Sequence, residues 1–122
     1  MTWLTSLVEQ LVQTIRGEAG IPVYVGWRPA TIIPMAILQI RNCEVTPLDL
    51  SANIHLITAD VQIDFWHSSA KECDETVEKT LAALERARDS LGIFFLGVEG
   101  LADVGDEKAF RKMLLLRLKT VK

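Results

Sequence analysis

The sequence ITADVQIDFWHSS, residues 57–69, decides which fold the chain can adopt. Apolar and polar residues alternate from Ile57 to Phe65, which predicts a strand with one face in the core and the other toward water. A pair of serines ends this strand, and Ser69 stands three residues before Glu72, which is the spacing of a capping box. The stretch therefore predicts a long strand that leads directly into a helix.

Two amphipathic helices are predicted from apolar residues that recur every three or four positions. The first runs from Trp3 to Ile15 and is ended by Gly17 and Gly20, while the second follows the serine pair and is closed by Gly92. The apolar stripe of the second helix consists of Ala70, Cys73, Val77, Leu81, Leu84, Ala87 and Leu91. Both stripes are typical of helices that pack on a sheet.

Four further strands complete the predicted elements, at Val23–Val25, Met35–Asn42, Ile93–Val98 and Phe110–Val121. The chain ends on the last of them, so we expect that strand at a sheet edge, with its leucines Leu114, Leu116 and Leu118 toward the core. The element order is helix, strand, strand, strand, helix, strand, strand. This order predicts an α+β fold with a mixed, mainly antiparallel sheet of about five strands packed against two helices.

The connections between these elements differ in character. Residues 27–34 contain two prolines and are expected to form a connecting arm, and residues 100–108 a turn. The segment Cys43–Asn53 has turn formers, a proline and the isolated Leu48 and Leu50. It predicts a loop that is either a mobile hairpin tip or a contact arm whose leucines meet a partner.

Length and charge restrict the class of protein. A chain of 122 residues is most simply one domain, 1–122, and its formal net charge of -3 argues against nucleic-acid binding through overall charge. Cys43 and Cys73 match no metal or redox spacing, and we expect both to be reduced thiols, with Cys73 packed in the core. No segment resembles a signal peptide or a membrane span, so the chain is expected to be soluble where it is made.

Catalytic constellations are largely missing from the sequence. Neither His55 nor His67 has a second ligand at metal spacing, and no glycine-rich phosphate loop occurs. A thiolate-imidazole pair of Cys73 and His67 is conceivable around the turn, although helix packing explains Cys73 better. Asp60 and Asp64 share a strand face and are explained by solvation. We therefore expect no enzyme activity, no catalytic residues, no cofactor and no metal.

Positive charge is concentrated in the last predicted strand. Arg111, Arg117 and Lys119 occupy its outward face, with Lys112 and Lys122 nearby. Such residues either protect a sheet edge from uncontrolled pairing or contact an acidic neighbouring subunit.

Taken together, three features resemble a known family. They are the strand PVYVG at residues 22–26, the proline-punctuated arm, and VQIDFWHSS at residues 61–69 leading into a long helix. In this element order the chain resembles the tail terminator, or tail completion, proteins of long-tailed bacteriophages, a group with similar small neck and minor tail proteins.

The resemblance implies a structural virion protein, made in the host cytoplasm and located in the tail or neck. It implies a homo-oligomeric, commonly hexameric ring that caps the tail tube, ends its polymerisation and offers a surface to the head connector. The expected partners are the tail tube protein and the head-tail connector protein. No membrane and no sequence-specific nucleic acid are expected, although DNA passes through such a ring. From exposure arguments we nominate Arg28, Leu48, Leu50, Arg111 and Arg117 as interface residues.

Two other hypotheses remain open at this point. A head-completion or neck connector protein of similar fold differs from a terminator in the partner it meets. A small α+β ligand-binding module, or an enzyme subunit, belongs to a different class and predicts a concave pocket with converging polar groups.

Overall fold

The computed structural model describes residues 3–26, 33–51, 53–105 and 109–122. They form an α+β fold with the predicted element order and with two helices and a five-stranded sheet. The elements are α1 (Trp3–Ala19), β1 (Val23–Val25), β2 (Met35–Pro47), β3 (His55–His67), α2 (Ala70–Ala87), β4 (Ile93–Val104) and β5 (Phe110–Val121). None of the helices in these residues is long and apolar enough to cross a bilayer.

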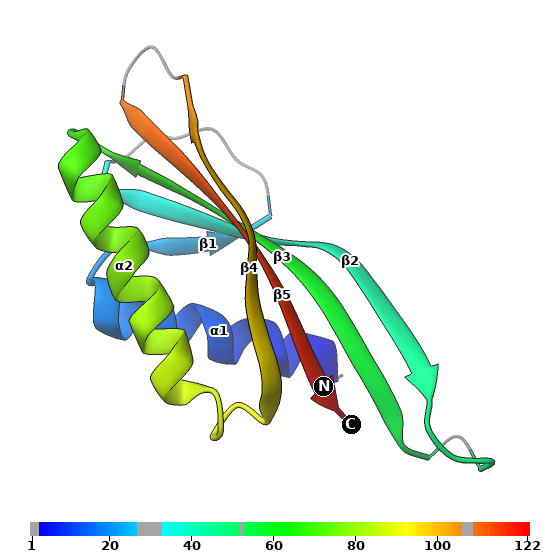
Figure 1. Ribbon diagram of the computed structural model, residues 1–122. Coiled ribbons are helices and arrows are strands. Elements are labelled where there is room, and N and C mark those ends of the chain that lie inside the picture. Colours follow the sequence, from blue (N-terminus) through cyan, green and yellow to red (C-terminus); the bar gives the residue numbers. More distant parts are fainter. Residues whose placement is uncertain (1–2, 27–32, 52, 106–108) are drawn as a thin grey trace.

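The sheet has the strand order β1-β2-β3-β5-β4. β1 pairs with β2 in parallel, and all the other pairings are antiparallel, as the sequence predicted for most of the sheet. The main core combines buried residues of both helices with a single face of the sheet. Figure 1 shows α1 and α2 beside the body of the sheet. The opposite face carries no helix in the described part of the chain and is called the open face below.

The two faces of β3 follow the predicted alternation, with one exception. Ala59, Val61, Ile63 and Phe65 are buried in the main core, and Ile57 is also fully buried. The opposite face is only partly wet, because Asp64 is fully buried and Trp66 packs with Met35 and Ile37 in a second small cluster. The expectation of a solvated Asp64 was therefore wrong, since the side chains of Arg111 and Gln62 contact its carboxylate.

Local signals place both ends of α2. Ser69 adopts an extended conformation and its hydroxyl accepts a hydrogen bond from the Glu72 amide at 3.2 Å, which satisfies a free donor of the first turn. Gly92 has a φ of +73°, a conformation that a side chain disfavours, and it leads the chain into β4. α1 continues past Gly17 and ends at Ala19. The next residue, Gly20, has a positive φ, and its amide donates to the Arg16 carbonyl at 3.0 Å.

The predicted loop Cys43–Asn53 was wrong over its first half. β2 continues to Pro47, and the residues from Cys43 onward pair with β3 down to His55. The strand tolerates Pro47 because its last part lies at an edge of the sheet, where an amide donor is not required. Among the described residues of the predicted loop, 48–51 and 53 remain outside the strands.

The end of the chain also differs from expectation. β4 extends to Val104, so the turn predicted at 100–108 was wrong for residues 100–104, while residues 106–108 lie outside the described residues. β5 is not an edge strand, because it lies between β3 and β4. This central position buries Leu114, Leu116 and Leu118 as predicted and pairs the backbone of β5 on both sides.

Candidate interaction surfaces

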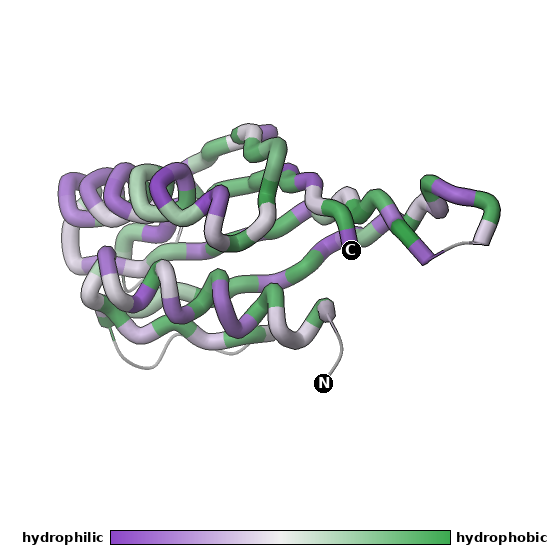
Figure 2. Tube along the Cα trace, turned by 90° about the horizontal axis from the view of Figure 1, so that it is seen from below, coloured by the Kyte–Doolittle hydropathy of each residue, from purple (hydrophilic) through white to green (hydrophobic). Residues whose placement is uncertain are grey.

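The hairpin of β2 and β3 projects beyond the helices (Figure 1). We call its outer part, residues 42–58, the arm. Figure 2 shows hydrophobic and hydrophilic residues alternating along this arm, which stands apart from the body of the protein. β5 runs along the β3 side of the arm nearly to its tip, where the His55 amide and carbonyl pair with Lys122 at 2.8 and 3.0 Å. Up to Pro47 the arm is therefore a paired extension of the sheet, where the sequence predicted a loop from Cys43.

The tip of the arm has a defined conformation. The Leu48 amide donates to the Ile54 carbonyl at 2.8 Å, and the Asp49 carboxylate accepts the Asn53 amide at 2.9 Å. These bonds hold the leucines outward, since Leu48 is 53% exposed and Leu50 is 109% exposed. Exposed apolar side chains that gather on a projection are typical of an interaction site. Leu48 and Leu50 are thus exposed, which is the property for which they were nominated as interface residues.

Arg111 lies on the open face but is not the exposed cation that we expected. Its Nη2 donates to Asp64 Oδ1 at 3.1 Å, and its guanidinium lies 5.2 Å from the centre of the Trp66 ring. Only 20% of the Arg111 side chain is exposed. The exposure argument for Arg111 was therefore wrong, because the side chain is engaged by groups of its own chain.

Arg117 is more accessible and holds two carboxylates together. Its Nε lies 2.9 Å from Asp60 Oδ1 and 3.3 Å from Glu99 Oε1, and 44% of the side chain is exposed. The hydrogen bond from Arg117 is the main reason why the pKa of Asp60 is below its ordinary value. Both groups line a groove of about 310 Å³ on the open face, together with Arg41 and Leu115.

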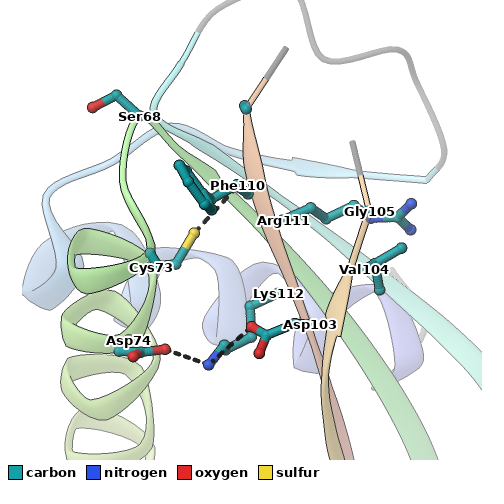
Figure 3. A pocket seen from close by; sticks show the side chains of 11 residues that line it. Ser68, Cys73, Asp74, Asp103, Val104, Gly105, Phe110, Arg111 and Lys112 are labelled. Carbon is teal, nitrogen blue, oxygen red and sulfur yellow. Dashed lines mark hydrogen bonds and ion pairs between the residues drawn. The ribbon is translucent and has the colours of Figure 1, made fainter. Parts of the chain in front are cut away.

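A larger cavity of about 620 Å³ opens between the start of α2, the end of β4 and the start of β5 (Figure 3). Lys112 reaches across it to Asp74 on α2 and to Asp103 on β4, the latter at 3.2 Å. The hydrogen bond with Asp74 is the main cause that raises the pKa of Lys112. The lysine is therefore a stable cation that ties the helix to the strand, and it is poorly suited to proton transfer.

Cys73 lines the same cavity but does not form the conceivable pair with His67. Its thiol is buried and donates to the Phe110 carbonyl at 3.2 Å (Figure 3), and burial raises its pKa. The His67 ring contacts the Thr76 hydroxyl at 2.6 Å instead. A protonated thiol without a general base is a weak nucleophile.

Three further expectations from the sequence concern Arg28, the cysteines and metal binding. Arg28 lies outside the described residues. Both cysteines are free thiols. Within the described part of the chain, no group of three or more His, Cys, Asp or Glu side chains is arranged to hold a metal ion.

Sequence reasoning missed the surface of β4. This strand forms one edge of the sheet and exposes large apolar side chains. They are Phe94, Phe95, Val98 and Leu101, each between 43% and 54% exposed. The available signal was the strongly apolar composition of residues 93–98, from which we predicted only a strand.

Comparisons with known proteins identify no family. No family model and no curated protein match the sequence. The fold is similar to that of a chain in the virion of a native gene transfer agent (GTA) particle, with a TM-score of 0.53, 18% identity, and coverage of 94% of this chain and 92% of that chain. The chain therefore shares its fold, over nearly its whole length, with a component of a virion particle.

Proposed function

We propose that this protein is a structural component of a phage-type virion that closes the end of the tail tube as a ring. In this role it ends tail polymerisation and offers the surface to which the head connector binds. The observation that carries the proposal is the fold shared over 94% of the chain with a component of a gene transfer agent virion. The choice of tail terminator within that class rests on the element order and on the resemblance of residues 22–26 and 61–69.

The surfaces of the molecule support an assembly role. A ring subunit needs to contact copies of itself and at least two other proteins, so it needs several separate contact surfaces. The structure offers the apolar tip of the arm, the apolar edge at β4, and the charged open face around Arg117. Each belongs to a different region of the fold.

The proposed role requires no covalent chemistry. Its physical basis is non-covalent contact between preformed surfaces, of the kind that makes large assemblies. The cavity beside α2 suits this interpretation, since its Cys73 thiol and Lys112 ammonium are held in unreactive protonation states.

The experiment that tests the proposal is electron microscopy of lysates from a phage that carries the gene and from its deletion mutant. Filled heads beside unattached tubes of abnormal length are expected in the deletion. Heads that leak DNA beside normal, finished tails would transfer the assignment to head completion. Intact virions would overturn the virion role altogether.

A matched pair of variants makes this test specific to the arm. Leu50→Asp supplied in trans should fail to restore particles, because it places a charge at the most exposed apolar position of the tip. Glu78→Arg changes charge on the exposed side of α2 and should restore them. Restoration by both would remove the arm from the proposed function.

A further inference from the structure

β4 is a long edge strand that lacks several of the usual protections against pairing. It is twelve residues long and, among the described residues, pairs with β5 alone. Edge strands are normally protected by charged side chains, proline, bulges or short length, and residues 93–104 carry Glu99 and Asp103 but no lysine, arginine or proline. Its two shifts of register against β5 bend it, yet Phe95–Val98 between them stays in continuous register. A strand of this kind is a template for another strand.

The opposite edge of the sheet offers such a strand. β1 pairs only with Ala36–Leu38, so the part of β2 from Gln39 to Pro47 pairs with β3 alone among the described residues. This part of β2 includes residues 42–47 of the arm and exposes Arg41, Glu44 and Val45.

Strand direction makes the two edges compatible. Three antiparallel pairings separate β2 from β4, so the two strands run in opposite directions. A second copy related by rotation would therefore place its β2 antiparallel to β4 of the first copy. That arrangement is a heterologous, head-to-tail contact, which is the kind that closes rings.

Matching irregularities occur at the same level of both edges. The pairings Ile40–Val61, Val61–Leu116 and Leu116–Val98 form one row across the sheet. Arg41, directly after Ile40, is the unpaired residue of the β2 shift, and Glu99, directly after Val98, is that of the β4 shift. The two shifts therefore place opposite charges at the same level on opposite edges.

The charges around Glu99 leave it with a shared cation. Glu99 and Asp60 share the guanidinium of Arg117, while the charge of Arg41 in the same chain acts on Asp60 and helps to lower its pKa. Arg41 is exposed and makes no ion pair within the described residues. A second copy would bring Arg41 to this acidic position, while another protein's strand would not necessarily carry a cation there.

We propose that β4 pairs with the free part of β2, residues 39–47, of a second copy of this chain, with Arg41 of that copy placed beside Glu99. The inference rests on the proposed function, because it supplies the contact between copies that a ring requires. The occupant of the β4 edge is thus the same protein, and the sheet continues from one subunit to the next.

The test is a cysteine cross-link that exploits the native thiols. Cys43 is partly exposed on β2, while Cys73 is buried and does not compete. Cys43 lies in the same row of the sheet as Leu96, and residue 98 lies two residues along β4 on the same face as Leu96. In the proposed contact, a cysteine introduced by Val98→Cys would therefore lie within reach of Cys43 of the second copy through a short bis-maleimide. Each copy would carry one thiol at each edge, so a ladder of dimers, trimers and larger species is expected.

Controls define the outcomes of this test. Peptide mapping should find Cys43 linked to position 98, and Cys43→Ser should abolish the ladder. Cross-linking no greater than that of Glu78→Cys, or links between identical positions only, would overturn the proposal in favour of a different occupant. Glu99→Arg should weaken self-association about tenfold, and adding Arg41→Glu should restore it.

The proposal and the proposed function can fail separately. A ladder together with intact virions in the deletion lysate would retain the contact and reject the tail role. Abnormal tubes in that lysate without a ladder would retain the tail role and reject the contact between β4 and β2.

Discussion

Arg111 Nη2 lies 3.1 Å from Asp64 Oδ1, and the carboxylate that it neutralises is fully buried. Gln62 supplies a second hydrogen bond to Asp64 Oδ2 at 2.8 Å. The Trp66 ring lies beneath the guanidinium and completes this cluster on the open face. A charge removed from water is tolerated here because cation and amide are both held in place by strand pairing.

Arg111→Ala should strongly destabilise the protein, since among the described residues it leaves the buried Asp64 carboxylate with the Gln62 amide as its remaining partner. Removing one member of a buried ion pair typically costs about 3–5 kcal/mol of unfolding free energy. Urea denaturation measures the loss. Arg86→Ala, which breaks the exposed ion pair with Glu18, is the control and should cost less than about 1 kcal/mol. Equal losses in the two variants would contradict the importance of the buried charge.

Ser69→Ala should cost about 1 kcal/mol, because it removes the hydroxyl that accepts the Glu72 amide at the start of α2. Ser68→Ala is a matched control one residue earlier. The Ser68 hydroxyl contacts only the exposed Glu72 carboxylate in the described structure, so its loss should be smaller. The midpoint of thermal unfolding ranks the two variants. A larger effect at Ser68 would mean that the cap is misassigned.

Stability should fall as the pH is lowered through the range just below 6.5. Burial lowers the pKa of His67, an effect that Glu72 opposes. The unfolded chain therefore binds a proton at higher pH than the folded chain, and the free energy of unfolding decreases as pH falls from the ordinary histidine pKa toward the lower folded value. His67→Gln should flatten this dependence between pH 7 and 5, whereas His55→Gln should retain it. An unchanged slope in His67→Gln would exclude His67 as its source.

Much of the fold was predictable because its signals are local. The alternation from Ile57 to Phe65 and the cap at Ser69 depend on neighbouring residues only, and the structure confirms both. The extent of β4 was not predictable in this way. Its register shifts interrupt the alternation of side chains, and Gly97 and Gly100 are typical of turns.

The surfaces were harder to predict, because they depend on pairings between distant residues. Asp64 is buried by an arginine 47 residues later in the chain, which no local pattern reveals. Likewise, the position of β5 between β3 and β4 follows from the order of the sheet and cannot be read from the end of the chain. Leu48 and Leu50 are exposed, as isolated leucines among turn formers already indicate, and their role at an interface stays a prediction.

The double variant Leu48→Ser, Leu50→Ser separates assembly from folding most clearly. Both side chains are more than half exposed, and the hydrogen bonds that order the tip come from backbone groups and Asp49. Truncating them should leave the unfolding free energy within about 0.5 kcal/mol of the natural protein, as is usual for surface substitutions.

The same double variant should nevertheless fail to restore particles in the deletion lysate, because the proposed contact surface of the arm is lost. Val25→Ser, at another exposed apolar position on β1, is the matched control and should restore them. If the double variant assembled normally, the leucines would be incidental surface residues. A folded protein that cannot assemble would show instead that backbone groups and Asp49 hold the shape of the tip, while the leucine side chains make the contact.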